Sequence, residues 1–201
     1  INITVKKDAK KIYDIINKKN YKFIKEAKDN NELYGSIKPK DLSKTIEDIE
    51  IARGLLNKAI SLDNNLISAR NLLGQTYDDG GDQNRAMEIF KTSYSIAEKN
   101  NNKHGIMVTC GSMGVVNLIM GLLDIALEYL ETQQALAKEL DDKYEFYASL
   151  GNTVLIHIQK GDYDHAMDCL EKIMQIAEEL DQLEWIANTA GNMGIVQGRK
   201  G

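Results

Sequence analysis

Residues 151–181 read GNTVLIHIQKGDYDHAMDCLEKIMQIAEELD, and this stretch decides the fold because it is one copy of a recurring pattern. The preceding copy, residues 111–141, reads GSMGVVNLIMGLLDIALEYLETQQALAKELD. The two copies are 40 residues apart (161 − 121 = 40), and small residues hold the same places in both: Gly121 and Gly161, Ala126 and Ala166, Ala137 and Ala177. A fixed period of this length predicts an array of structural repeats.

Each copy is expected to form two antiparallel helices. Within the second helix, Ala166, Leu170, Ile173 and Ala177 lie at positions i, i+4, i+7 and i+11, which places them on one apolar face. The first helices carry glycine at matching places, Gly74, Gly114 and Gly194, and we expect two helix backbones to approach closely at Gly114 and Gly194. A larger side chain there would overpack the helix crossing.

The turn between the two helices is expected at Gly161, because glycine adopts the left-handed conformation of a helix C-terminus at low cost. Asp162 then caps the second helix, so that the two helices span about residues 142–160 and 163–180. We likewise predict that Asp141 and Asp181 are the N-caps of the first helices that follow them.

Several of these positions match a known signature: Leu73, Gly74, Tyr77, Gly81, Asp82, Ala86 and Phe90. Over about residues 46–201 the sequence resembles the tetratricopeptide repeat family, in the branch whose repeat is about 40 residues long instead of about 34. That branch includes spindle-orientation adaptors and bacterial peptide-sensing regulators. The resemblance implies an all-α fold in which helix-turn-helix repeats stack as a right-handed α-solenoid.

The repeat array is expected over residues 41–201, in units of about 41–65, 66–101, 102–141, 142–181 and a truncated unit at 182–201. Because the last unit holds only a first helix, we expect either that the parent protein continues or that the uncovered helix docks on something. Residues 1–40 are expected to form a basic helical segment. Its lysines surround an apolar stripe that fits a helix capping the first repeat better than a surface for anionic lipid or an acidic partner.

Charge and composition narrow the class of partner. Residues 1–50 carry a net charge of +3 and residues 51–201 a net charge of −8, and the acidic main body argues against binding nucleic acid. The longest apolar stretch, residues 115–123, is far shorter than the roughly 20 residues of a membrane span. The scattered Cys110 and Cys169 favour a reducing, cytoplasmic location, although a first residue other than methionine leaves a removed signal peptide open.

In the family that the sequence resembles, the first helices line a concave groove that holds a protein or an extended peptide. The groove residues that we predict in this chain are Asn71, Gln75, Asp78, Ser112, Val115, Asn152, Leu155, Asn188, Asn192 and Ile195. Similar long-repeat proteins often use asparagine to contact a peptide's main chain, which the resemblance carries over to Asn152 and Asn192 and, to a lesser degree, to Ser112. The alternative is that these amides bond to the adjacent repeat and only tie helices together.

The leading hypothesis is therefore a non-catalytic scaffold that binds a protein or peptide in its concave groove. A second hypothesis is a regulatory sensor module of a larger signalling protein or transcriptional regulator. A third is self-association through the uncovered last helix, residues 182–201.

The sequence predicts no catalytic, cofactor or metal site. His165 and Cys169 lie four residues apart on one helix face, but no third ligand is indicated, and packing or surface roles explain both residues better. His157 is interpreted as a hydrogen-bonded residue between helices. No arrangement of nucleophile, base and orienting residue can be proposed, which makes an enzyme the least favoured class.

Overall fold

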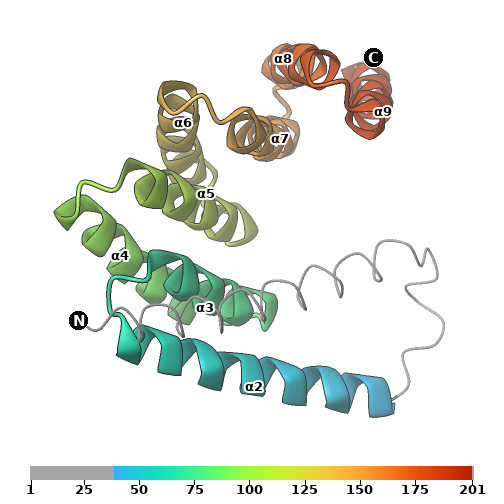
Figure 1. Ribbon diagram of the computed structural model, residues 1–201. Helices are drawn as coiled ribbons and strands as arrows, with labels where there is room; N and C mark the ends of the chain where they lie inside the picture. The colour runs from blue at the N-terminus through green and yellow to red at the C-terminus, as the bar shows by residue number, and fades with distance from the viewer. Residues whose placement is uncertain (1–38, 201) are drawn as a thin grey trace. The chain divides into compact units, whose positions relative to one another are not determined.

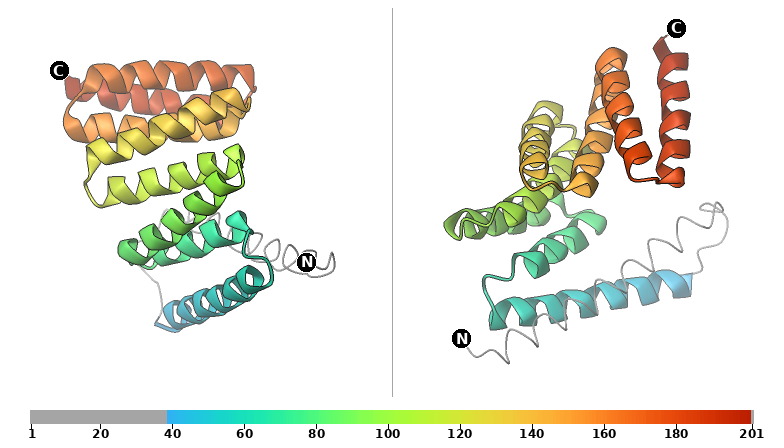
Figure 2. Two further views of the ribbon diagram at one scale, coloured as in Figure 1. Left: turned by 90° about the vertical axis from the view of Figure 1, so that its left-hand side faces the viewer. Right: turned by 45° about the horizontal axis from the view of Figure 1, so that its top comes forward.

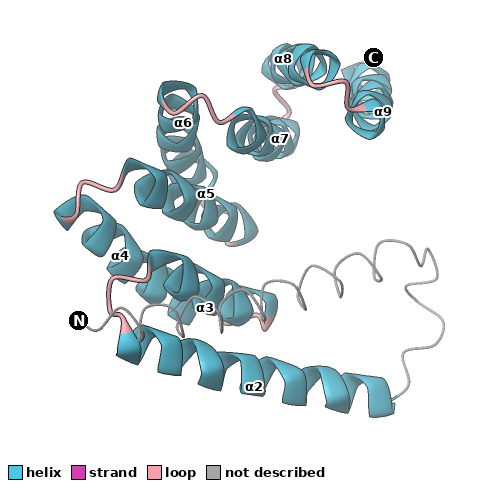
Figure 3. Ribbon diagram, in the orientation of Figure 1, coloured by secondary structure: helices cyan, strands magenta, loops and turns pink. Residues whose placement is uncertain are grey.

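The computed structural model describes residues 39–200, with side chains from residue 49 onward, and these residues form helices joined by short turns (Figures 1 and 3). The helices are α2 (Pro39–Leu62), α3 (Ile67–Asp79), α4 (Gln83–Lys99), α5 (Lys103–Ile119), α6 (Leu123–Glu139), α7 (Lys143–Lys160), α8 (Tyr163–Glu179) and α9 (Leu183–Lys200). No strand occurs among the described residues, so the predicted all-α class is confirmed. The predicted basic segment, residues 1–40, lies outside the described residues except for the first two residues of α2.

The chain separates into two compact units, one up to Ile96 and the other from Ala97 onward, and the division falls within α4. In the first unit, α2 packs on α3. In the second unit each helix packs on the next, from α5 to α9, and the first helices α5 and α7 also touch (Figures 1 and 2). A helix-turn-helix pair is thus the building block within this unit.

Six turns, 20 residues apart, join consecutive helices from α3 to α9 in one manner. A single residue in each turn adopts the left-handed conformation, with φ between 51° and 80°: Gly81, Asn101, Gly121, Asp141, Gly161 and Asp181. The N–H of the following residue donates back to a carbonyl five residues earlier, as Asp162 does to His157 over 2.8 Å. This hydrogen-bond pattern is the Schellman motif, which satisfies carbonyls at a helix end, and it confirms the turn predicted at Gly161.

The N-caps of the first helices differ from the prediction. Asp141 and Asp181 are the left-handed residues that end the preceding helix, with φ of 54° and 52°. The cap of α7 is the next residue, Asp142, whose carboxylate accepts the backbone N–H of Glu145 over 3.0 Å. Aspartate tolerates the left-handed region better than most residues, so adjacent aspartates divide the two roles between them.

Small residues lie where helices cross closely, as predicted for Gly114, and Gly74 holds the same place on α3. A Cβ at Gly74 would lie 2.4 Å from the ring of Phe90, and a Cβ at Gly114 would lie 2.9 Å from Leu130. Neither phenylalanine nor leucine has room to retreat, because both are almost completely buried. At Gly194 no atom lies within 4 Å of a Cβ, so the close crossing expected there is not formed.

Apolar residues on the inner faces form the core of the second unit. One cluster joins Leu150 and Val154 of α7, Leu170 and Ile173 of α8, and Val196 of α9. Cys110 and Cys169 are free and buried. No helix within residues 39–200 combines the length and the apolarity that a crossing of the lipid bilayer demands.

Candidate functional site

The predicted groove residues of the second unit occupy matching positions on α5, α7 and α9. They form a polar set and, three residues further along each helix, an apolar set: Ser112, Asn152 and Asn192, then Val115, Leu155 and Ile195. Ser112, Asn152 and Val115 are half-buried. Leu155 is 51% exposed and Ile195 is 55% exposed, which is high for large aliphatic side chains.

The three polar residues differ in their hydrogen bonding. The hydroxyl of Ser112 donates to the carbonyl of Val108 in its own helix over 3.2 Å. The side-chain amides of Asn152 and Asn192 form no hydrogen bond with any residue in the range 39–200. Within that range, these two amides therefore do not tie neighbouring helices together.

The remaining predicted groove residues are more scattered. Asn71 is only 4% exposed and has an interaction partner, so little of its side chain is open to a ligand. Gln75 is exposed, and Asp78 is half-buried on the same helix, α3. Burial raises the pKa of Asp78, and the neighbouring charge of Asp79 adds to the effect. Asn188 is exposed on α9.

A hollow of about 100 Å³ lies among α7, α8 and α9 and brings together two of the predicted residues, Leu155 and Asn192. It is lined by Tyr147, Gly151, Val154, Leu155, Ile158, Leu170, Ile173, Thr189 and Asn192. Most of these side chains are apolar, and the polar ones come from α9. The volume of the hollow is below the roughly 300–1,000 Å³ of small-molecule pockets, so it suits a single apolar side chain of a partner better than a whole small ligand.

The previous repeat explains why the hollow is open. Gly111 of α5 holds the place of Gly151, and there the side chain of Gln133 fills the space, 2.6 Å from where a Cβ would stand. In the next repeat the residue at the position of Gln133 is Ile173, and no atom lies within 4 Å of a Cβ at Gly151. The shorter isoleucine leaves unfilled the space that the glutamine occupies.

One aromatic residue, Tyr147, lines the hollow, and its ring belongs to a group of three that were not among the predicted site residues. Trp185 of α9 stacks on Tyr147 of α7, with ring centroids 3.8 Å apart and an angle of 18° between the planes. Tyr144 meets the edge of Trp185 at 5.3 Å and is 58% exposed. Burial, followed by the charge of Glu184, raises the pKa of Tyr147. The one signal in the sequence was that Trp185 is the chain's single tryptophan.

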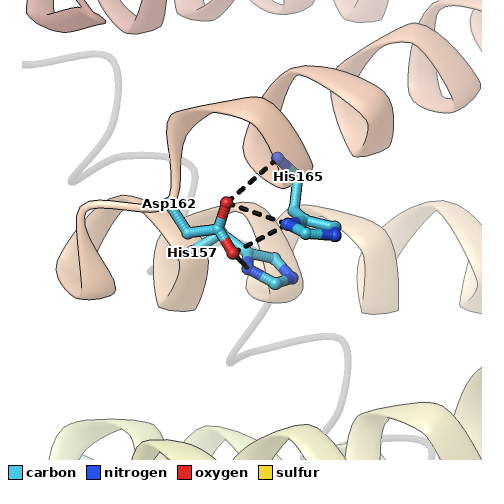
Figure 4. Close-up of side chains that lie close together, drawn as sticks. All are labelled: His157, Asp162 and His165. Atoms are coloured by element: carbon cyan, nitrogen blue, oxygen red, sulfur yellow. Dashed lines mark hydrogen bonds and ion pairs between the residues drawn. The ribbon is translucent and has the colours of Figure 1, made fainter.

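A second cluster of polar side chains occupies the turn between α7 and α8 (Figure 4). The carboxylate of Asp162 lies 2.7 Å from Nδ1 of His165 and 3.4 Å from Nδ1 of His157. The two imidazole rings stack with their centroids 5.3 Å apart. The sequence had paired His165 with Cys169 on one helix face, whereas the turn brings together histidines eight residues apart.

Electrostatics in this cluster follow from the shared carboxylate. Its hydrogen bond with His165 raises the pKa of that imidazole and lowers the pKa of Asp162. Burial lowers the pKa of His157, although the charge of Asp162 opposes the shift. Nδ1 of His157 is buried and faces the carboxylate of Asp162 at 3.4 Å, longer than an ordinary hydrogen bond, so the expected bond between helices is present only as this weak contact.

Two segments of the chain, residues 67–100 and 145–180, match the family model of the tetratricopeptide repeat. Each segment holds one helix-turn-helix pair, α3 with α4 and most of α7 with α8. No curated protein sequence matches the chain.

Several solved structures share the fold. A putative kinesin light chain from Podosopora anserina matches with a TM-score of 0.63 and 14% identity, over 78% of this chain and 80% of that one. BtubC (BKLC) from P. vanneervenii matches with a TM-score of 0.65 and 15% identity, over 99% and 85%. A signal transduction ATPase with a tetratricopeptide repeat sensor, from Pyrococcus horikoshii, matches with a TM-score of 0.65 and 16% identity, over 77% of this chain but 26% of that one.

Proposed function

Because this chain is a tetratricopeptide repeat protein, we propose that it is a non-catalytic scaffold that binds a protein or an extended peptide on the face of α5, α7 and α9. Tetratricopeptide repeats generally serve as protein-interaction scaffolds, since stacked helix pairs present an extended surface. The hollow among α7, α8 and α9 carries the proposal, because it unites Leu155 and Asn192 with the ring of Tyr147.

Chemistry on this face suits an extended peptide. The free amides of Asn152 and Asn192 each offer donors and an acceptor for a peptide backbone, and their lack of partners within residues 39–200 supports that role over the alternative of tying helices. The exposed Leu155 and Ile195 offer apolar surface beside them. A peptide that places one apolar side chain in the hollow and its main chain along the amides would use both features.

A display selection of peptides on the 201-residue chain tests the proposal, with titration of the selected peptide followed by the fluorescence of Trp185. This tryptophan stacks on Tyr147, which lines the hollow, so occupation of the hollow should change its emission. We expect the double variant Asn152→Ala/Asn192→Ala to bind about tenfold more weakly, because each lost hydrogen bond contributes about 0.5–1.5 kcal/mol.

The matched control is Gln175→Ala, which removes an exposed amide from α8, a helix outside the proposed face, at a position that does not line the hollow. Its affinity should equal that of the native chain. Equal affinity of the double variant and the native chain, with both variants folded by circular dichroism, would overturn the assignment of this face.

A sensor module is the second candidate. The neighbour from Pyrococcus horikoshii is described as carrying a tetratricopeptide repeat sensor, and this chain corresponds to about a quarter of it. A sensor must populate two conformations that bind its ligand differently. Hydrogen exchange with and without the selected peptide distinguishes the two functions: a scaffold gains protection only on the binding face, whereas a sensor changes protection in helices that the peptide does not touch.

A further inference from the structure

The turn between α7 and α8 holds a group of metal-ligating side chains that the proposed peptide-binding face does not use (Figure 4). His157 lies near the end of α7, Asp162 caps α8, and His165 lies in the first turn of α8. One ligand atom from each of the three residues lies within 4.8 Å of the other two. All three histidines of the chain lie among the described residues, and His104 is remote in sequence, on α5.

Backbone hydrogen bonds hold the three residues in place. The N–H of Asp162 donates to the carbonyl of His157 over 2.8 Å, which closes the Schellman turn around the left-handed Gly161. The N–H of His165 donates to Oδ1 of Asp162 over 3.3 Å, which is the N-cap bond of α8. The positions of the three Cα atoms therefore follow from the fold, so that the side chains converge without any ligand to gather them.

The same turn forms elsewhere without histidine. At the α3–α4 turn the equivalent residues are Tyr77, Asp82 and Arg85, where Asp82 caps α4 and the Arg85 guanidinium lies 5.5 Å from the tyrosine ring. At the α5–α6 turn they are Asn117, Leu122 and Ile125. Neither the turn nor the cap requires an imidazole, so the repeat architecture does not account for the pair of histidines.

The distances among the ligand atoms approach those of a coordination sphere. Zinc bonds to histidine nitrogen and carboxylate oxygen measure roughly 2.0–2.2 Å, so the ligand atoms of a tetrahedral site stand about 3.3 Å apart. Oδ2 of Asp162 lies 3.4 Å from Nδ1 of His157 and 2.7 Å from Nδ1 of His165. Nδ1 of His157 is buried and makes only the long contact with Asp162, so it gives up little hydrogen bonding on coordinating an ion.

We propose that His157, Asp162 and His165 bind a divalent transition-metal ion of the zinc class, with solvent in the fourth position. Imidazole and carboxylate ligands suit Zn²⁺, whereas Mg²⁺ and Ca²⁺ require mostly oxygen ligands. Solvent reaches the site, because the side chain of His165 is 67% exposed and that of Asp162 is 38% exposed. The nearby ammonium of Lys160 pairs with Asp124 over 2.5 Å, which partly offsets its repulsion of a cation.

An ion in this position joins the end of α7 to the start of α8. Because the three ligands converge only in the folded turn, the ion binds the folded chain more tightly than the unfolded chain and raises the thermal midpoint of unfolding. The sequence predicted no metal site. The proposal differs because the turn brings together residues from two helices, α7 and α8. The site is independent of the peptide-binding face.

Titration of the 201-residue chain with ZnCl₂ by isothermal calorimetry, in the presence of a non-thiol reductant, tests the site. The variants are His157→Asn and His165→Arg, which introduce residues that the other repeats carry at the same places, Asn117 and Arg85. The fold should therefore tolerate them, as circular dichroism checks. The controls are His104→Asn, which removes the third histidine, and Cys169→Ala, which removes the thiol one helical turn beyond His165.

We expect one Zn²⁺ per native chain, unchanged binding in both controls, and at least about tenfold weaker binding in each of the two variants. Loss of even an outer partner of a metal ligand costs about 10–100-fold in affinity. Zinc should raise the thermal midpoint of the native chain and of the controls, and MgCl₂ should not. The proposal is overturned by equal zinc affinity in His157→Asn and the native chain, by loss of binding in Cys169→Ala, or by no saturable binding to the native chain.

Discussion

Alanine substitutions at Gly111 and Gly151 should have opposite effects on stability, although the two glycines hold the same place in consecutive repeats. Replacing glycine by alanine inside a helix stabilises it by about 1 kcal/mol. At Gly151 no atom lies within 4 Å of the new Cβ, so the whole gain is retained. At Gly111 the Cβ would lie 2.6 Å from the buried amide of Gln133, whose Nε2 donates to Glu145 over 2.7 Å.

Displacing Gln133 removes a hydrogen bond to a charged group, which contributes about 1.5–3 kcal/mol. Gly111→Ala should therefore be destabilised by about 1 kcal/mol and Gly151→Ala stabilised by about 1 kcal/mol. Urea unfolding followed by circular dichroism measures both free energies of unfolding, provided that their dependence on urea concentration has the same slope in both variants. Since the substitution is the same, effects on the unfolded chain largely cancel. Two midpoints that move upward together would show that Gln133 does not fill its space, and would remove our explanation of the hollow.

Three further outcomes follow from single residues. Gly121→Ala should lower the free energy of unfolding by about 1 kcal/mol, because the residue is left-handed with a φ of 75°, and Asp141→Gly at the equivalent turn should not lower it; urea unfolding measures both. Burial, with the charge of Glu98, raises the pKa of Cys110 from 9.0 to about 12, so the unfolded chain releases this proton first and stability falls as pH rises from 9 to 12. Between pH 9 and pH 12, the free energy of unfolding should fall less in Cys110→Ala than in the native chain, as urea unfolding at each pH measures. If α9 mediates self-association, Leu183→Glu, which changes a 75% exposed residue, should shift sedimentation toward the monomer, and equal sedimentation of both chains would contradict that hypothesis.

The repeat and its helices were predictable because close helix crossings and left-handed turns require glycine or alanine, which therefore recur at fixed intervals in the sequence. Gly121 and Gly161 adopt the left-handed conformation that the pattern indicated. The roles of Asp141 and Asp142 were not predictable in the same way, because aspartate suits both a left-handed position and an N-cap. When two aspartates follow one another, the sequence does not show which one is left-handed and which one is the N-cap, and only the backbone conformation decides.

The candidate site was predictable only in part. The positions of Leu155 and Asn192 followed from the repeat, but the hollow between them depends on the length of a side chain on another helix, Ile173. The cluster around Asp162 cannot be recognised from one helix face, on which His165 lies beside Cys169. A left-handed turn brings residues i and i+8 together instead, which gives the pattern His-x4-Asp-x2-His as the signal to seek.

Both candidate sites involve the repeat formed by α7 and α8, and a physical reason connects them. The small residues of the crossing and the left-handed turn maintain the backbone in every repeat, so side chains at the other positions are free to differ without loss of the fold. Ile173 in place of glutamine opens the hollow, and His157 in place of tyrosine or asparagine supplies a ligand beside Asp162. The neighbouring repeat serves as an internal control. There the same backbone carries Gln133, which fills the space of the hollow, and a turn without histidine. Transferring Gln133 to the later repeat, as Ile173→Gln, should close the hollow while leaving zinc binding at the turn unchanged.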